Sequence, residues 1–253
     1  MKTLIIQIKK GGLGDHLFFS HLPRIAKETG AYDKVLFSNQ SDCRHSDTIA
    51  LIWKLNPWLD GFTEEIGEYH FPDKVNESQN LLDAIMLAYG LEDGIRYHEP
   101  EIYYTPHQRK ELLDAVVYDP NYISFTGKLK SGKKIEEWFK KEKIQVDYQM
   151  RNLKNRSLTI HSANNEISTA SIFELCDLII SCQRVYCLTT GTATLAAALG
   201  KSVTVFYGDG HDSLYRHSKL HHYEPLGTDY TLKNYLVFYF ALAIQKLIPF
   251  GKR

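Results

Sequence analysis

The first residues of this chain that could do chemistry lie in a glycine turn near the amino terminus. The stretch IQIKKGGLGDHLFFSHLPRIAKETG (6–30) places three glycines between an apolar segment and an amphipathic one, and Asp15 and His16 follow them directly. A glycine-rich turn between a strand and a helix usually holds a phosphate group. Because a carboxylate repels such an anion, the task of Asp15 needs a separate explanation.

Two nucleotide-binding patterns match this turn only in part. Gly12 and Gly14 fit the first two glycines of a dinucleotide fingerprint, but Leu17 stands at the third position, and 34–38 ends without an acid for a ribose. The loop that binds nucleoside triphosphates needs Gly-Lys-Ser/Thr, and this chain has Gly-Asp-His. A dinucleotide-dependent oxidoreductase is therefore kept only as a minor alternative.

Asp15 has two candidate roles. At a helix start, the free N–H groups and the helix dipole favour an ionised carboxylate, and such a carboxylate in a crevice can take a proton from an attacking hydroxyl. Alternatively, Asp15 only caps the helix, which is the commoner role of an aspartate at this position. His16 is a second candidate for handling protons, with a plain surface position on the helix as the alternative.

A second turn with anion-binding chemistry lies in the other half of the chain. Gly191 allows close approach to the backbone, and the free N–H groups that start the alanine-rich segment 191–200 can receive a diphosphate. Four hydroxyls add donors: Thr189, Thr190, Thr192 and Thr194. A plain helix cap packed with small residues fits the same letters equally well.

The segments that must position these turns alternate between strand and helix. Hydrophobic periodicity predicts strands at 3–8, 34–38, 122–127, 144–150, 157–163, 184–190 and 202–208. It predicts helices at 15–27, 47–55, 77–89, 133–141, 171–182 and 191–200. Such alternation indicates parallel sheets joined by right-handed crossovers.

A polar, proline-containing stretch interrupts this alternation. We place a domain boundary between Pro106 and Pro120, which gives domains 1–115 and 116–253. The predicted fold class is α/β, with two Rossmann-like βα domains facing a central crevice.

Composition limits the partners of the protein. Thirty lysines and arginines balance thirty aspartates and glutamates among 253 residues, so there is no basic field for nucleic acid. The chain has neither a C-x-x-C pair nor an H-E-x-x-H motif, and we expect no bound metal and no cofactor. No stretch approaches the roughly 20 apolar residues of a membrane span, which favours a cytoplasmic protein.

Three motifs, taken in order, resemble the ADP-heptose:lipopolysaccharide heptosyltransferases and their relatives. KKGGLGDHLFFSHLPRIAK (9–27) is similar to the family's opening strand and Gly-x-Gly-Asp turn, and LNPWLDGF (55–62) to its Asn-Pro-aromatic segment. The block 171–208 is similar to its carboxyl-terminal helix, strand, glycine turn and alanine-rich helix. The resemblance implies a GT-B fold and an inverting, metal-independent glycosyltransferase of cell-surface polysaccharide synthesis. Its acceptor site would lie in the first half and its nucleotide-sugar site in the second.

The resemblance also assigns roles to residues. Asp15 matches the family's general base, and the turn from Thr189 to Thr194 matches its diphosphate-binding turn. The loop TGKLKSGKK (126–134) matches one that brings a lysine to the phosphates, so Lys128, Lys130, Lys133 and Lys134 are candidates, or else a solvated helix start. Asp209, His211 and Asp212, in a histidine-rich loop, are candidates for contacting the donor sugar.

Departures from the family leave alternatives open. Thr189 and Thr194 stand where the family commonly has aspartate and histidine, which allows a catalytically inactive sugar-nucleotide-binding module. The expected partners are a nucleotide-sugar donor and a glycan or glycolipid acceptor. The apolar helix expected at 231–249 either rests on the inner face of the cell membrane or packs back on the first domain, and we favour packing.

Overall fold

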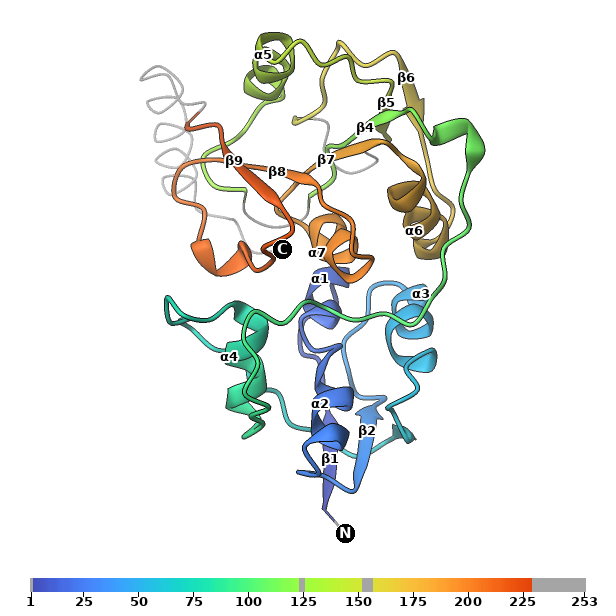
Figure 1. The fold of residues 1–253 in the computed structure, drawn as a ribbon, viewed down its shortest axis with the longest axis vertical. Coiled ribbons are helices and arrows are strands. Elements are labelled where there is room, and N and C mark those ends of the chain that lie inside the picture. The colour runs from blue at the N-terminus through green and yellow to red at the C-terminus, as the bar shows by residue number, and fades with distance from the viewer. Residues whose placement is uncertain (1, 123–125, 152–156, 229–253) are drawn as a thin grey trace, which may run out of the picture.

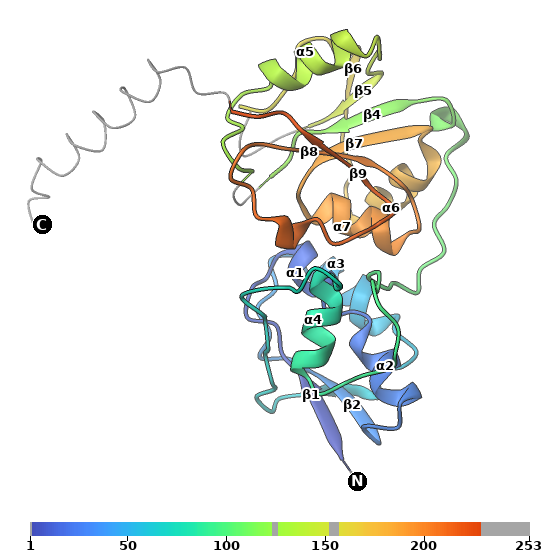
Figure 2. The ribbon, with the colours of Figure 1, turned by 60° about the vertical axis from the view of Figure 1, so that its left-hand side comes forward.

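The computed structural model describes residues 2–122, 126–151 and 157–228. These residues form two parallel sheets, one in each half of the chain, with helices between successive strands. Figure 1 shows the first half below and the second half above, and Figure 2 shows the same arrangement after rotation. The predicted α/β class is confirmed. The helix expected at 231–249 lies outside the described residues.

The first half is built on a sheet of three parallel strands in the order β1-β2-β3. The strands are β1 (Thr3–Ile6), β2 (Lys34–Ser38) and β3 (Gly61–Thr63). The helices of this half are α1 (Leu13–Leu17), α2 (Leu22–Glu28), α3 (Ser46–Ile49), which continues into a π-helical turn over Ala50–Lys54, and α4 (Leu81–Ala88). Ile5 pairs with Leu36 across β1 and β2. The short strand β3 has no counterpart among the sequence predictions.

The second half contains six parallel strands in the order β6-β5-β4-β7-β8-β9. The strands are β4 (Val116–Asp119), β5 (Tyr148–Met150), β6 (Asn165–Ile167), β7 (Arg184–Leu188), β8 (Thr204–Tyr207) and β9 (His222–Pro225). The helices are α5 (Lys133–Lys141), α6 (Ile172–Ser181) and α7 (Gly191–Ala198), with 3₁₀ turns at Lys110–Leu112 and Ser213–Tyr215. The chain builds outward from β4 in one direction and then from β7 in the other, so the switch point of the sheet lies between these two strands. Ligands of such sheets bind outside the carboxyl ends of the strands at the switch point.

The first predicted helix is divided in the structure. The sequence predicts one helix over 15–27, but α1 ends at Leu17 and α2 begins at Leu22. Pro23 stands in the first turn of α2, where the missing proline N–H costs no hydrogen bond. Between the helices, Ser20 donates its hydroxyl to the carbonyl of Leu17 over 2.7 Å. Proline therefore starts a new helix here instead of lying inside a long one.

Three strand predictions in the second half need correction. β4, one of the two middle strands of the sheet, lies within the stretch taken as the domain boundary. Residues 123–125 of the strand expected at 122–127 lie outside the described part. The expected strand 157–163 is absent, and β6 at 165–167 pairs with β5 instead. Leu158 and Ile160 are buried, but their backbone groups bond to side chains: Leu158 O accepts from the Tyr118 hydroxyl and Ile160 N donates to Gln149 Oε1. The sheet also continues past β8 to β9, which periodicity did not indicate.

The two halves share one apolar core at their junction. A single cluster of buried side chains runs from Leu4 and Phe37 of the first sheet to Val117 and Val205 of the second. A smaller cluster around Tyr118 lies in the second half. The amino-terminal ends of α1 and α7 meet at the junction (Figures 1 and 2). The carboxyl ends of both sheets thus approach each other at the place where the two predicted turns lie.

Candidate active site

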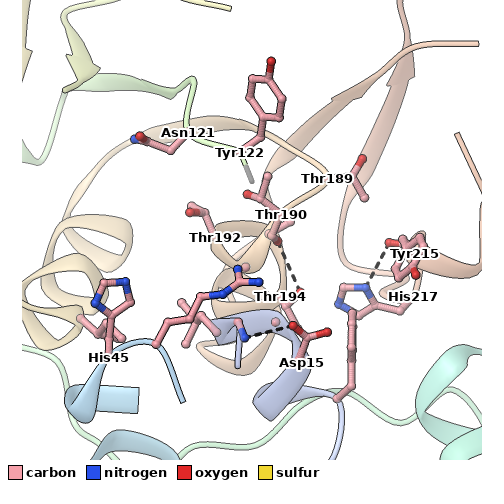
Figure 3. A pocket seen from close by; sticks show the side chains of 18 residues that line it. Asp15, His45, Asn121, Tyr122, Thr189, Thr190, Thr192, Thr194, Tyr215 and His217 are labelled. Atoms are coloured by element: carbon pink, nitrogen blue, oxygen red, sulfur yellow. Dashed lines mark hydrogen bonds between the residues drawn. The ribbon is translucent and has the colours of Figure 1, made fainter. Parts of the chain in front are cut away.

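A pocket of about 300 Å³ lies between the halves. Its lining comes from the two glycine turns, from the loops after β2 and β4, and from the loop after β8 (Figure 3). The lining residues are Gly12, Leu13, Gly14, Asp15, Phe18, Arg44, His45, Asn121, Tyr122, Ile172, Thr189, Thr190, Gly191, Thr192, Ala193, Thr194, Tyr215 and His217. Asp15 and Thr189 are 174 residues apart in the sequence. The structure therefore brings Asp15 and the threonine turn to one cavity.

Asp15 is the third residue of α1 and faces the pocket. Its Oδ2 accepts a hydrogen bond of 3.1 Å from the backbone N–H of Gly12, the residue that precedes the helix. This bond is a helix cap, so the capping role is present. The carboxylate nevertheless remains half-buried in the wall of the pocket, where a substrate can reach it. Capping and proton transfer are therefore compatible at this residue.

Burial raises the pKa of Asp15 above its ordinary value, although the N–H of Gly12 and the charges of Lys10 and Arg44 act in the opposite direction. This direction is opposite to the one that the helix dipole alone predicts, because removal of the carboxylate from water outweighs the favourable partners. A base accepts a proton more readily as its pKa approaches the working pH. The burial of Asp15 therefore shifts its pKa in the direction that general base catalysis at neutral pH favours.

His16 is fully buried and does not line the pocket. Its Nδ1 accepts the indole N–H of Trp53 over 2.9 Å, which leaves Nε2 to donate to the carbonyl of Asp42, also at 2.9 Å. Burial lowers the pKa of His16 to about 4. Both predictions for His16, proton handling and a surface position, are therefore wrong. His16 instead joins α1 to the loop after β2 as a neutral side chain.

The turn before α7 offers hydroxyls without partners. Thr190 is the residue that precedes the helix, and its side chain makes no capping hydrogen bond. Among the described residues, Thr189 Oγ1 and Thr190 Oγ1 are buried and lack any hydrogen-bond partner. Buried polar atoms are nearly always satisfied, so two adjacent exceptions at the wall of a pocket need an explanation. Both hydroxyls therefore have hydrogen-bonding capacity that the described residues do not use.

Thr192 and Asn121 are held together by a buried carboxylate. Asp119, at the end of β4, accepts the hydroxyl of Thr192 at 2.6 Å and both the backbone N–H and the side-chain amide of Asn121, at 2.9 and 2.6 Å. Burial raises the pKa of Asp119, and these three donors oppose the shift. Asp119 thus fixes one residue on each side of the switch point. Thr194 donates to the carbonyl of Thr190 at 3.4 Å, within its own helix.

Gly191 has a second reason to be glycine. A Cβ at this position would lie 3.0 Å from the Cβ of Leu13 and 3.1 Å from the backbone nitrogen of Gly14. Contacts this short would force the two helix starts apart. The prediction that Gly191 serves approach of a ligand is therefore incomplete, because Gly191 first serves the approach of the other half of the protein.

The predicted lysines do not reach the pocket. Lys128 and Lys130 are exposed, and Lys133 is exposed on α5, 3.8 Å from Glu137. None of them is among the lining residues. The cation at the pocket is Arg44, in the loop that follows β2. Arg44 is not among the site residues predicted from the sequence. A basic residue just beyond the carboxyl end of a parallel strand is nevertheless a recognisable indication of an anion-binding site.

The histidine-rich loop 208–221 contributes other residues than those predicted. Asp209 and Asp212 are exposed, and His211 packs between the rings of Tyr207 and Tyr215, outside the pocket. Tyr215 and His217 line the pocket instead, as Figure 3 shows. Nothing in the sequence distinguishes the residues of this loop from one another, since loop conformation depends on contacts that are distant along the chain.

A second cavity opens on the other side of Asp15. Asp15, Arg44 and Tyr215 belong to both cavities, and the second is completed by Lys9, Lys10, Gly11, Asp42 and Cys43. Three cations thus line this second cavity, all in loops that follow β1 and β2. Asp15 stands between a cavity at the start of α7 and a cavity rich in positive charge.

Two features, a metal-binding cluster and a membrane-spanning helix, were considered for the described residues. Within residues 2–122, 126–151 and 157–228 no three histidine, cysteine or acidic side chains are grouped as a metal site would require. In the same part of the chain no helix has the length and apolar character needed to cross a membrane.

Comparison with solved structures identifies proteins of the same fold. The glycosyl transferase family 9 protein of Veillonella parvula DSM 2008 is 9% identical, with a TM-score of 0.61 over 99% of this chain and 91% of that one. ADP-heptose lps heptosyltransferase II of E. coli is 13% identical, with a TM-score of 0.59 over 98% and 100%. The dodecameric iron-containing heptosyltransferase TibC, solved with ADP-D-beta-D-heptose, is 13% identical, with a TM-score of 0.59 over 87% of this chain and 62% of that one.

Comparisons at the level of sequence are negative. No protein-family model matches the chain, and no curated protein matches it. The likeness therefore rests on three-dimensional structure, where it extends over nearly the whole chain. The protein has the two-sheet α/β fold of these glycosyltransferases, with GT-B architecture.

Proposed function

We propose that this protein is a glycosyltransferase that moves a sugar from a nucleotide-sugar donor to a hydroxyl of a glycan or glycolipid acceptor, on the cytoplasmic side of the cell. The observation that carries the proposal is the position of Asp15. Its half-buried carboxylate separates a cavity at the start of α7 from a cavity lined by cations. Transfer requires a base within reach of the acceptor hydroxyl, and the fold shared with heptosyltransferases supports this proposal.

The donor diphosphate is assigned to the first cavity. There it would accept hydrogen bonds from the backbone N–H groups of Gly191 and Thr192 and from the unpartnered hydroxyls of Thr189 and Thr190. Arg44 adds a positive charge at the same wall. These groups stabilise the charge that develops on the departing nucleoside diphosphate without a metal ion.

The chemical step follows from the location of the base. Asp15 takes the proton from an acceptor hydroxyl, the hydroxyl oxygen forms a bond to the anomeric carbon, and the bond from that carbon to the diphosphate oxygen breaks. We propose that the acceptor enters from the second cavity and that its hydroxyl attacks from the face opposite the leaving diphosphate. The configuration at the anomeric carbon is therefore inverted.

The acceptor is assigned to the second cavity. Lys9, Lys10 and Arg44 give this cavity three positive charges against the carboxylates of Asp15 and Asp42. Lys9 and Lys10 also lie over the rings of Tyr69 and Phe71, at 5.9 and 5.2 Å from the ring centres. Such a surface favours an acceptor that carries a phosphate or carboxylate near the reacting hydroxyl.

A panel of nucleotide sugars tests the proposal. The purified protein is mixed with ADP-, UDP-, GDP- and dTDP-linked sugars, and thermal shift and slow release of the nucleoside diphosphate are measured with and without EDTA. We expect the sugars linked to one of these four nucleotides to raise the Tm of the protein. We expect the same nucleotide sugars to be hydrolysed slowly, at a rate that EDTA does not change. Binding without any release would indicate an inactive binding module, and release only in the presence of manganese would contradict the metal-free mechanism.

A further inference from the structure

The loop 208–221 is held against the first half of the protein, although it belongs to the second. Ser218 donates its hydroxyl to Glu99 Oε1 at 2.9 Å, and the ring of His217 contacts that of Phe18 edge to face, with centres 5.2 Å apart. Lys219 Nζ lies 3.1 Å from the ring centre of Tyr97. The two pocket residues of this loop, Tyr215 and His217, are therefore positioned by contacts across the junction.

Asn80 makes the most buried of these contacts. It precedes α4, and its Oδ1 accepts the N–H of Asp83 at 3.0 Å, which is an ordinary helix cap. Its Nδ2 donates both protons: one to the carbonyl of His98 at 2.6 Å and one to the carbonyl of His217 at 2.7 Å. The side chain is only 5% exposed. All of its usual hydrogen-bonding groups are engaged, and one bond reaches a residue that lines the pocket.

The choice of asparagine separates this role from capping. Serine, threonine and aspartate cap helices about as well as asparagine does, but none of them can accept from N3 and donate two further hydrogen bonds. Capping of α4 therefore does not require asparagine. The two donated bonds, to the carbonyls of His98 and His217, do require asparagine, because a buried carbonyl without a partner is costly.

The surroundings of Asn80 are rigid. Asp83 accepts the N–H groups of Asn80, Tyr97 and His98, and its Oδ1 is 2.7 Å from His98 Nδ1. His98 Nε2 bonds to Asp93 at 3.0 Å. Asp83 and His98 are 0% and 6% exposed. Asn80 thus extends from a buried, hydrogen-bonded block of the first half to the loop 208–221 in the pocket wall.

We infer that Asn80 is a positioning residue for the transfer reaction: through the carbonyl of His217 it sets the place of Tyr215 and His217 beside Asp15. This inference rests on the proposed function for its kinetic consequence only. The position of the loop itself can be measured without any substrate.

The experiment compares Asn80 with a matched buried asparagine. Asn80→Ser keeps an acceptor for the cap and has one hydroxyl donor in place of the two amide donors, and Asn80→Asp keeps the acceptor and loses both donors. Asn56 is 4% exposed, donates to Ser20 O at 3.3 Å and accepts from Trp58 N at 2.9 Å, wholly within the first half. Asn56→Ser and Asn56→Asp are therefore controls for the loss of a buried amide that does not reach the pocket.

Two measurements are made on each variant at a temperature well below its Tm. Amide hydrogen exchange of 213–219 should become faster in both Asn80 variants and stay unchanged in both Asn56 variants. With donor and acceptor, kcat/KM should fall by roughly tenfold or more for the Asn80 variants, as expected for one unsatisfied buried carbonyl, and by less than about twofold for the controls. In an Asn80→Ser, His217→Ala double variant the two losses should be less than additive.

The outcomes are distinct. If exchange of 213–219 is unchanged in the Asn80 variants, or if Asn56 variants lose the same share of kcat/KM, Asn80 is only a structural residue and the inference is wrong. If exchange rises as expected but the wild-type protein transfers no sugar, the loop is held by Asn80 and the proposed function fails instead.

Discussion

Gly14 and Gly191 lie face to face at the junction of the two halves. A Cβ on Gly14 would be 3.5 Å from the Cα of Gly191 and 3.4 Å from Thr194 Oγ1. These are ordinary contact distances, so a Cβ fits at Gly14. A Cβ on Gly191 would lie 3.0 Å from Leu13 Cβ, so the close approach of the starts of α1 and α7 depends on Gly191.

Substitution of Gly191 should therefore act on the junction before it acts on a ligand. Gly191→Ala places a methyl group 3.0 Å from Leu13 Cβ, and Gly191→Val adds two more carbon atoms. We expect the free energy of unfolding to fall by about 1–3 kcal/mol, with the larger loss for valine. Urea unfolding of both variants measures this. A Gly191→Val protein with wild-type stability and unaltered nucleotide affinity would contradict both roles.

Asp15→Asn tests the base. Asparagine retains an oxygen for the Gly12 N–H, so the cap survives, but the amide takes no proton. Transfer should fall by roughly 10²–10⁴-fold, with donor affinity nearly unchanged. Since burial raises the pKa of Asp15, its ionised form opposes folding at neutral pH, and the amide should leave stability equal or higher.

The pH profile provides a second measurement on Asp15. Transfer by the wild-type protein should decrease as the pH falls through the raised pKa of Asp15, because the protonated carboxyl is no longer a base. Near wild-type turnover by Asp15→Asn would leave Asp15 as a helix cap alone.

Arg44→Gln decides between the cation in the pocket and the lysines indicated by the sequence. Arg44 lines both cavities, whereas Lys133 lies outside them, 78% exposed. We expect Arg44→Gln to weaken nucleotide-sugar binding by about tenfold, in the range of one charge-assisted hydrogen bond. The matched Lys133→Gln variant should bind as the wild type does. The reverse result, measured by calorimetric titration, would return the diphosphate to the 126–134 loop.

The buried pair of His98 and Asp83 predicts how stability depends on pH. Burial acts to lower the pKa of His98, but the hydrogen bonds to Asp83 and Asp93 outweigh it and raise the pKa above 6.5. The stabilisation is therefore complete below pH 6.5 and is lost as the pH rises through the raised value. Burial acts to raise the pKa of Asp83, yet its bonds from the His98 side chain and from three backbone N–H groups bring the pKa to about 2. That contribution is present above 3.8 and disappears as the pH falls toward 2.

Urea unfolding of the wild type and of His98→Gln at pH 5.5 and pH 9 checks this expectation. The difference in unfolding free energy between the two proteins should be larger at pH 5.5. An equal difference at both values would mean that His98 is neutral in the folded protein.

The sequence was most informative where local patterns decide the structure. The β2 strand at 34–38 and the α5 helix at 133–141 have the predicted bounds, because each shows one clear apolar period and ends in a residue that stops it. The two glycine turns were also found from their letters. The likeness to glycosyltransferases emerged from the order of motifs, and the solved structures bear it out at the level of fold.

Residues that depend on distant contacts were missed or misplaced. The sequence leaves His16 as a candidate for handling protons or as a surface residue, because nothing near it in sequence indicates Trp53, its hydrogen-bond donor. β4 was taken for a linker because prolines surround it, although it is one of the two middle strands of its sheet. Arg44 and Asn121 follow from the topology, since both come just after parallel strands whose ends meet at the pocket.

The single apolar cluster that joins both halves has a consequence for how the chain folds. Leu4 and Phe37 belong to the same packed unit as Val205, so neither half can bury its apolar surface fully alone. We expect one cooperative melting transition rather than two, and separately expressed halves that are poorly soluble until mixed. During synthesis, the core of the first half is therefore completed only after the second half has been made. We therefore expect the pocket between the halves to form in the same step as the folded state.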